Sequence, residues 1–245
     1  MAGYAVIRVA RFFMYAPRCV TFSSMNPIFD ADCRRCPRLA AFLDAVHAEE
    51  PDYHCRPVPP FGDPRARIVL VGLAPGMHGA NRTGRPFTGD HAGILLYRTL
   101  HKYGLASRPE SIAADDGLEL KDARITNSVK CLPPANKPLP AEVKECNAYL
   151  RAELQQSRNA RVILALGAIA HTAVLRVFDL PAAAFRFAHA AEHDLGAGRV
   201  LLDSYHCSRY NTQTRRLTTD MFEAVIQRAR DLALPEPRRD TGTTP

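Results

Sequence analysis

The chain has 245 residues, of which 47% are hydrophobic, and its formal net charge is +7 at pH 7. This length and apolar content exclude a disordered chain and suffice for one large domain, or two small ones. The positive charge favours a polyanionic partner such as nucleic acid, because lysine and arginine displace counterions from phosphates. No apolar run is long enough to cross a bilayer, so we expect no membrane association.

The two ends of the chain are set apart from the rest. Residues 1–24 contain three arginines and no acidic residue, which allows two interpretations: a signal peptide, or a true start at Met25. We therefore treat residues 1–29 as an N-terminal extension of uncertain status. Residues 235–245 are rich in Pro, Arg, Gly and Thr, and we expect a disordered tail there. Residues 30–234 are expected to form a single domain.

Short, nearly continuous apolar runs alternate with helical patterns along the chain. Such runs are typical of strands buried on both faces of a parallel sheet, and they occupy residues 67–72, 124–129, 161–166 and 199–204. Helical patterns occupy residues 37–49, 91–103, 140–155, 168–178 and 214–233. The alternation predicts an α/β fold, a single-domain three-layer sandwich whose central four-stranded parallel sheet is flanked by helices. Ligands of such sheets bind beyond the carboxyl ends of the strands.

Four of the seven cysteines form a pattern that indicates a metal centre. Cys33 and Cys36 have the spacing of a metal-binding pair, Cys131 follows the second predicted strand, and Cys146 lies in the next predicted helix. Four thiolates suit either tetrahedral zinc or a four-iron cluster, and the spacing also fits unrelated buried cysteines. Zinc sites usually use two short pairs, which favours iron–sulfur. The remaining cysteines are interpreted as free thiols of a reducing compartment.

The segment after the first predicted strand, GLAPGMHGANRTGRPFTGDHAG at residues 72–93, carries the densest candidate chemistry. Its glycines permit a close approach of the backbone to a ligand. Phe87 lies in an otherwise polar loop, where it would either stack on a base or join the core. Arg82 and Arg85 are candidates for contacts to phosphates.

As a whole this segment resembles motif A and the following loop of the iron–sulfur uracil-DNA glycosylases, most closely the family 5 (type b) branch. Three other stretches agree: CRRCP at residues 33–37, ITNSVKC at 125–131 and SYHCSRYNT at 204–212. The resemblance covers about residues 30–232 in the same order. It implies a [4Fe–4S] cluster on Cys33, Cys36, Cys131 and Cys146, which binds the N-terminal segment to the rest. The cluster is expected to be structural, with Lys130 and Lys137 giving the neighbouring loop a basic face toward DNA.

The implied activity is that of a monofunctional uracil-DNA glycosylase, which starts base excision repair by hydrolysing the bond between uracil and deoxyribose. The nucleotide must be flipped out of the stack to expose that bond. We expect His206 to stabilise the leaving base, Asn127 to bind the base or the water, and Asp90 or Asn127 to orient the water. The resemblance further implies base-binding residues Phe87, Asn81, Gly72 and Ala74 and DNA-binding residues Arg82, Arg85 and Arg209.

A loss shared with family 5 bears on substrate choice, and two departures from the superfamily pattern bear on strand opening. Leu73 and Ala74 stand where other families of the superfamily place a carboxylate or Asn, a loss that family 5 shares. Such a site would also admit other deaminated bases, such as hypoxanthine or xanthine. Cys207 replaces a common Pro, and Arg215 stands where Gly is expected.

The alternative function is a catalytically weak protein of the same fold that binds damaged DNA. A nucleotide- or phosphate-binding hydrolase is a further alternative, but the loop lacks the Gly-Lys-Ser/Thr ending of a P-loop and leaves the cysteines unexplained. We expect a monomer that acts on double- and single-stranded DNA in the bacterial cytoplasm, at the nucleoid.

Overall fold

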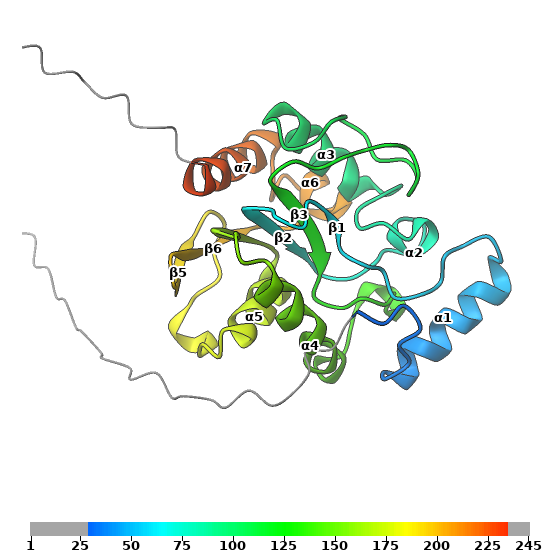
Figure 1. Ribbon diagram of the computed structural model, residues 1–245. Helices are drawn as coiled ribbons and strands as arrows, with labels where there is room; N and C mark the ends of the chain where they lie inside the picture. Colours follow the sequence, from blue (N-terminus) through cyan, green and yellow to red (C-terminus); the bar gives the residue numbers. More distant parts are fainter. Residues whose placement is uncertain (1–28, 235–245) are drawn as a thin grey trace, which may run out of the picture.

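The computed structural model describes residues 29–234, and nearly all of the N-terminal extension and the whole expected tail lie outside these residues. A six-stranded mixed sheet forms the centre, in the order β1-β3-β2-β4-β6-β5 (Figure 1). The four inner strands are parallel to one another: β3 (Ala123–Asn127), β2 (Ile68–Gly72), β4 (Val162–Leu166) and β6 (Arg199–Ser204). They match the four predicted strands, and the α/β class is confirmed.

The prediction of four strands is wrong, because an antiparallel strand closes each edge of the sheet. At one edge β1 (Phe61–Gly62) pairs with β3, and at the other β5 (Glu192–Gly196) pairs with β6. β1 has only two residues, and β5 has the largely exposed sequence EHDLG. Neither has the apolar run of a buried strand, because an edge strand can remain partly solvated.

Helices cover both faces of the sheet (Figure 1). One core contains alternate strand residues such as Val69 and Ile163 together with α1 (Pro37–Glu49), α4 (Pro140–Gln156) and α5 (Ala168–Val177). The other contains Leu70 and Leu164 together with α3 (His91–Lys102) and α7 (Thr219–Ala233). Because successive strand side chains face opposite sides, both faces need apolar residues, which explains the nearly continuous apolar runs.

The last predicted helix, residues 214–233, is wrong at its start. Residues 214–218 are not helical; they separate a short helix, α6 (Arg209–Gln213), from α7. α7 begins after Thr218, whose side chain accepts a hydrogen bond from the Met221 amide at 3.2 Å. Between the two helices Arg215 adopts a left-handed conformation with φ +56°, which ends helical geometry. The sequence departure at Arg215 therefore falls at a position where glycine would be free of strain.

The remaining elements are short. α2 (Ala80–Thr83) follows β2, and single 3₁₀ turns occupy Pro134–Asn136 and Ala182–Ala184. Among the residues that the structure describes, none of the helices has the length and apolarity needed to span a membrane.

Candidate active site

A cavity of about 630 Å³ opens at the carboxyl ends of β2, β3, β4 and β6. The parallel strands end together there, so the loops that follow them supply its walls. Six residues predicted from the sequence line this cavity: Ala74, Phe87, Asp90, Asn127, His206 and Arg209.

Asn127 is the last residue of β3 and is only 3% exposed. Its Oδ1 is buried and has no hydrogen-bond partner among the described residues. Gly72, at the paired position of β2, makes this placement feasible: a Cβ there would lie 2.4 Å from the Asn127 Oδ1 and 2.7 Å from the Phe87 ring. Gly72 does not line the cavity, so it serves the site by leaving room for two side chains that do. An unpaired buried oxygen is costly, and a ligand in the cavity would relieve that cost.

Phe87 and His206 form one wall of the cavity, with their rings stacked at a centroid distance of 5.7 Å and an interplanar angle of 28°. Phe87 is 6% exposed and has a positive φ of 55°. A positive φ is rare for a bulky residue, and such strain persists only where the surroundings enforce it. Burial lowers the pKa of His206 to about 4, so its imidazole is uncharged at neutral pH.

Asp90 caps the N-terminus of α3, where its Oδ1 accepts a hydrogen bond from the Gly93 amide at 2.9 Å. Its other oxygen faces Gly79, where a Cβ would lie 2.5 Å away. Burial raises the pKa of Asp90 above its ordinary value, although backbone hydrogen bonds oppose this shift. A raised pKa makes the ionised carboxylate a stronger base.

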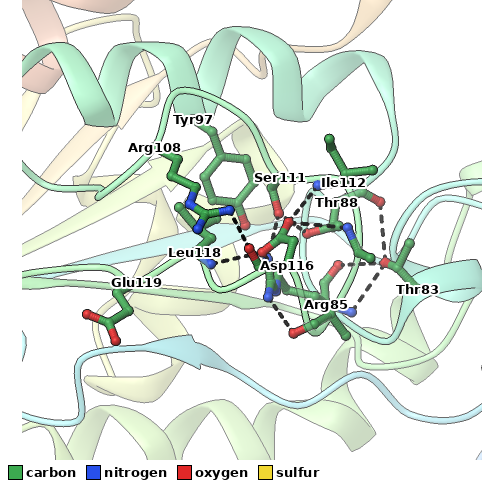
Figure 2. Close-up of polar contacts among 12 residues, drawn as sticks. Thr83, Arg85, Thr88, Tyr97, Arg108, Ser111, Ile112, Asp116, Leu118 and Glu119 are labelled. Carbon is green, nitrogen blue, oxygen red and sulfur yellow. Dashed lines mark hydrogen bonds and ion pairs between the residues drawn. The ribbon is translucent and has the colours of Figure 1, made fainter.

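Arg85 takes a different place from the one predicted. Its side chain is buried, and its Nη1 donates to the Asp116 carboxylate at 2.7 Å and to the Ser111 hydroxyl at 3.0 Å (Figure 2). The neighbouring Pro86 carbonyl accepts a hydrogen bond from the Tyr97 hydroxyl at 2.7 Å. Because its guanidinium is occupied inside the protein, the structure argues against the predicted phosphate contact. Arg85 instead fixes the loop that carries Phe87.

The other predicted residues also separate into two groups. Asn81 is fully buried outside the cavity lining, with its Nδ2 donating to the Cys55 sulfur at 3.4 Å, so it does not face a base. Arg82 and Arg209 are exposed and line an adjoining hollow together with Arg98. This second hollow shares Asp90 and Arg209 with the first cavity, which places three cations beside the mouth of that cavity.

Several lining residues were not predicted from the sequence. His78 lies on the rim, and its Nδ1 is 2.9 Å from the hydroxyl of Tyr53. Asn136 reaches the cavity from the loop after β3, where Ala135 and Asn136 both have positive φ. His78 falls inside the glycine-rich motif, which was a usable signal, whereas nothing local to Asn136 marks it as part of the site.

The four predicted metal-ligating cysteines come together at a separate hollow on the α1 side of the sheet. Cys36 directly precedes α1, and Cys146 lies in α4, where its sulfur accepts a hydrogen bond from the Lys130 amide at 3.3 Å. Burial, together with the proximity of the other three thiols, raises the pKa of Cys131 to about 12. Within residues 29–234, no three of these sulfurs lie within 4.8 Å of one another.

The prediction that Lys130 forms part of a basic DNA-facing surface is wrong. Its side chain is 1% exposed, and its Nζ lies 2.8 Å from the Glu153 carboxylate. Lys137 is exposed, so it alone of the two lysines faces solvent.

The sheet has a largely apolar cavity beyond its parallel strands, with a few polar groups, an uncharged histidine in the lining and cations beside the mouth, which is the arrangement of a ligand-binding site in an α/β enzyme. Comparison with known families agrees: residues 59–230 match the model of the uracil DNA glycosylase superfamily, and the chain belongs to this superfamily. This confirms the resemblance found in the sequence.

Relatives named type-5 uracil-DNA glycosylase match most of the chain. The one from Thermus thermophilus is 51% identical over 207 residues, which cover 82% of this chain and 94% of that protein. Those from Pyrobaculum aerophilum and Mycobacterium bovis are 43% and 44% identical, covering 81% and 82% of this chain and 88% and 78% of those proteins.

Proposed function

We propose that this chain is a uracil-DNA glycosylase that hydrolyses the N-glycosidic bond of uracil in DNA and thereby starts base excision repair. The observation that carries the proposal is the buried, unpartnered Oδ1 of Asn127 beside the stacked rings of Phe87 and His206. An amide oxygen that lacks a partner accepts a hydrogen bond from an N–H of a flipped base or from a water molecule.

The chemistry places negative charge on the departing base and positive character on the sugar. A neutral His206 donates one N–H toward the uracil oxygen on which charge develops, which stabilises the leaving anion. A neutral imidazole is a very weak acid, so it stabilises the leaving anion through a hydrogen bond without transferring its proton to the base. The wall formed by Phe87 and His206 provides a flat surface for the base.

The attacking water is assigned to Asp90 or Asn127. Burial raises the pKa of Asp90, which makes its carboxylate the better base of the two. Asp90 is held by the Gly93 amide, so its position is fixed before the substrate enters. With Leu73 and Ala74 at the mouth of the cavity in place of a carboxylate, other deaminated bases also fit the proposal.

The partner is DNA that contains uracil, in double- or single-stranded form, approached by a monomer. Arg82 and Arg209, beside the cavity mouth, are the proposed phosphate contacts. We further propose that the protein works in the cytoplasm of a bacterium, a compartment that keeps thiols reduced. In support, the cysteines of the described residues form no disulfides.

We also propose that Cys33, Cys36, Cys131 and Cys146 hold a [4Fe–4S] cluster. Four sulfurs around one zinc ion, with bonds of about 2.3 Å, would lie about 3.8 Å apart, so a wider spacing favours a cluster over a single ion. The bound cluster would supply a covalent link and no redox step. Its residues join the segment before α1 to the loop after β3 and to α4, which supports a structural role.

The experiment is incubation of the purified holoprotein with a duplex that contains one uracil, followed by alkaline cleavage at abasic sites. We expect strand cleavage by the wild type and strongly reduced cleavage by Asn127→Ala, with the same DNA affinity. Binding without any release of uracil, hypoxanthine or xanthine would contradict the proposal and favour the damaged-DNA-binding alternative.

A second variant tests the assignment of the water. Asp90→Asn keeps an oxygen that can cap α3 and removes the charge. We expect slower cleavage without a loss of thermal stability. Wild-type rates in this variant would remove Asp90 from the mechanism and leave Asn127 as the residue that orients the water.

A further inference from the structure

Two histidines and an aspartate converge at a place outside the cavity and the cysteine site. His171 comes from α5, His193 from β5 and Asp203 from β6. The His171 Nδ1 lies 2.9 Å from one Asp203 carboxylate oxygen, and the His193 Nε2 lies 3.1 Å from the other. The donor atoms of all three residues lie within 4.8 Å of one another.

The hydrogen bonds of His171 determine which of its nitrogens carries a proton. Its Nε2 lies 3.0 Å from the backbone carbonyl of Phe185, and because a carbonyl only accepts, Nε2 must donate. In a neutral imidazole the other nitrogen, Nδ1, then has a lone pair and no hydrogen. That lone pair faces an oxygen of Asp203, so two acceptors point at each other and require a cation between them.

The cation is either a proton, carried by His171 or by Asp203, or a metal ion. Two imidazole nitrogens and a carboxylate are ligands that zinc and its neighbours in the first transition row accept. With bonds of about 2.0–2.2 Å, such ligands lie about 3–3.5 Å apart around one ion, close to the observed 2.9 and 3.1 Å. Metal-bound histidines usually donate their second N–H to a backbone carbonyl, as His171 does toward Phe185.

We infer that His171 Nδ1, His193 Nε2 and the Asp203 carboxylate form a binding site for a divalent transition metal ion of the zinc type. Aromatic rings hold the two imidazoles in place: Phe187 lies edge-on to His171 at 5.7 Å, and Phe185 edge-on to His193 at 5.8 Å. Asp203 is fully buried, whereas the side chain of His193 is 14% exposed, so an ion would reach the site from solvent on the His193 side.

The position of the site indicates a structural function. Asp203 precedes His206 by three residues at the end of β6, and the ion would connect this strand to α5 and to the edge strand β5. It would thereby fix the strand end that carries the catalytic histidine. The inference does not depend on the glycosylase activity, because it rests on ligands that lie outside the cavity lining.

The test measures metal content in the full-length holoprotein. The protein is incubated with zinc, separated from free zinc by gel filtration, and analysed for zinc and iron per chain. We expect the wild type to retain about one zinc ion per chain while its iron content is unchanged, which excludes exchange at the cysteines. Zinc should also raise the unfolding temperature of the wild type.

Two variants of the most accessible ligand make the test specific. His193→Ala removes the ligand, and His193→Asn removes the imidazole but keeps a hydrogen-bond donor for Asp203. Both should lose the retained zinc and the shift in unfolding temperature while keeping their iron. His101→Ala, an exposed histidine of α3, is the control and should behave as the wild type. The inference is overturned if the wild type retains no zinc, or if either His193 variant retains as much as the wild type.

Discussion

Burial affects charged groups differently in the cavity and in two ion pairs outside its lining, Arg85–Asp116 and Arg38–Glu142, which we call the frame. In the cavity, burial dominates: it lowers the pKa of His206 to about 4 and raises that of Asp90, so both shifts favour the neutral forms. In the frame, burial also opposes the charged form of Asp116, yet Arg85 and three backbone amides hold its pKa well below its usual range.

The same balance holds for Glu142, whose pKa is lowered by the Arg38 side chain in spite of burial. The frame is therefore complete in the free protein, because each of these carboxylates already has its partner. The cavity is incomplete, with the Asn127 oxygen unpaired and His206 uncharged. The unpaired oxygen of Asn127 faces the cavity and is available to a ligand, whereas the carboxylates of the frame are already paired within the protein.

The largest effect is expected in the cavity. His206→Asn should lower the single-turnover rate of uracil release by about 10²–10³-fold, the usual loss when one donor to a developing anion is removed. The affinity for uracil-containing duplex, measured by fluorescence anisotropy, should stay within a few-fold. His101→Asn, on an exposed face of α3, should keep the wild-type rate. An equal loss of rate in both variants would mean that the comparison between regions is false.

A substitution that breaks an ion pair of the frame should lower the free energy of unfolding. Arg85→Ala leaves Asp116 without its buried partner and should lower the free energy of unfolding by about 3–5 kcal/mol, measured by chemical denaturation. The matched control is Arg228→Ala, which breaks an exposed two-point pair with Glu192 and should leave the denaturation midpoint near that of the wild type. If Arg85→Ala keeps full stability but loses DNA affinity, the original phosphate assignment is restored.

The smallest effect is expected at the cavity mouth. Arg209→Ala should weaken binding to duplex DNA several-fold at low salt and reduce the slope of log affinity against log salt by about 1. Arg158→Ala is the control, because Arg158 is also an exposed arginine but precedes β4, at the end of the sheet opposite to the cavity. Its DNA affinity and salt dependence should be those of the wild type. An identical change in both variants would show that the mouth is not the DNA-binding surface.

The sequence predicted those parts of the molecule that depend on local pattern. The four inner strands were identified by their apolar runs, and Asn127 and His206 by their positions at the end of one strand and just beyond another. The edge strand β5 was missed because its exposed residues carry no such pattern. The start of α7 was placed too early, because the left-handed conformation of Arg215 is not evident from a side chain that suits a helix.

Pairings between distant loops escaped prediction for a different reason. Arg85 meets Asp116 at a separation of 31 residues, with α3 between the two loops, and no periodicity of the sequence places one opposite the other. Lys130 looked like a surface cation from its sequence, yet Glu153, on α4, neutralises it in the interior. Charge in a sequence therefore identifies groups that need partners, and only the fold decides whether the partner is a phosphate or a carboxylate.

The most direct test of the central claim, that burial keeps His206 uncharged for catalysis, is the pH dependence of uracil release. The quantity to measure is the single-turnover rate of the wild type divided by that of His206→Asn, because the ratio cancels the titration of Asp90. With a pKa of about 4, His206 stays neutral down to that pH, so the ratio should be constant from pH 8 to pH 5 and fall only as the pH approaches 4. A ratio that falls with a midpoint near the ordinary histidine pKa of about 6.5 would contradict the claim.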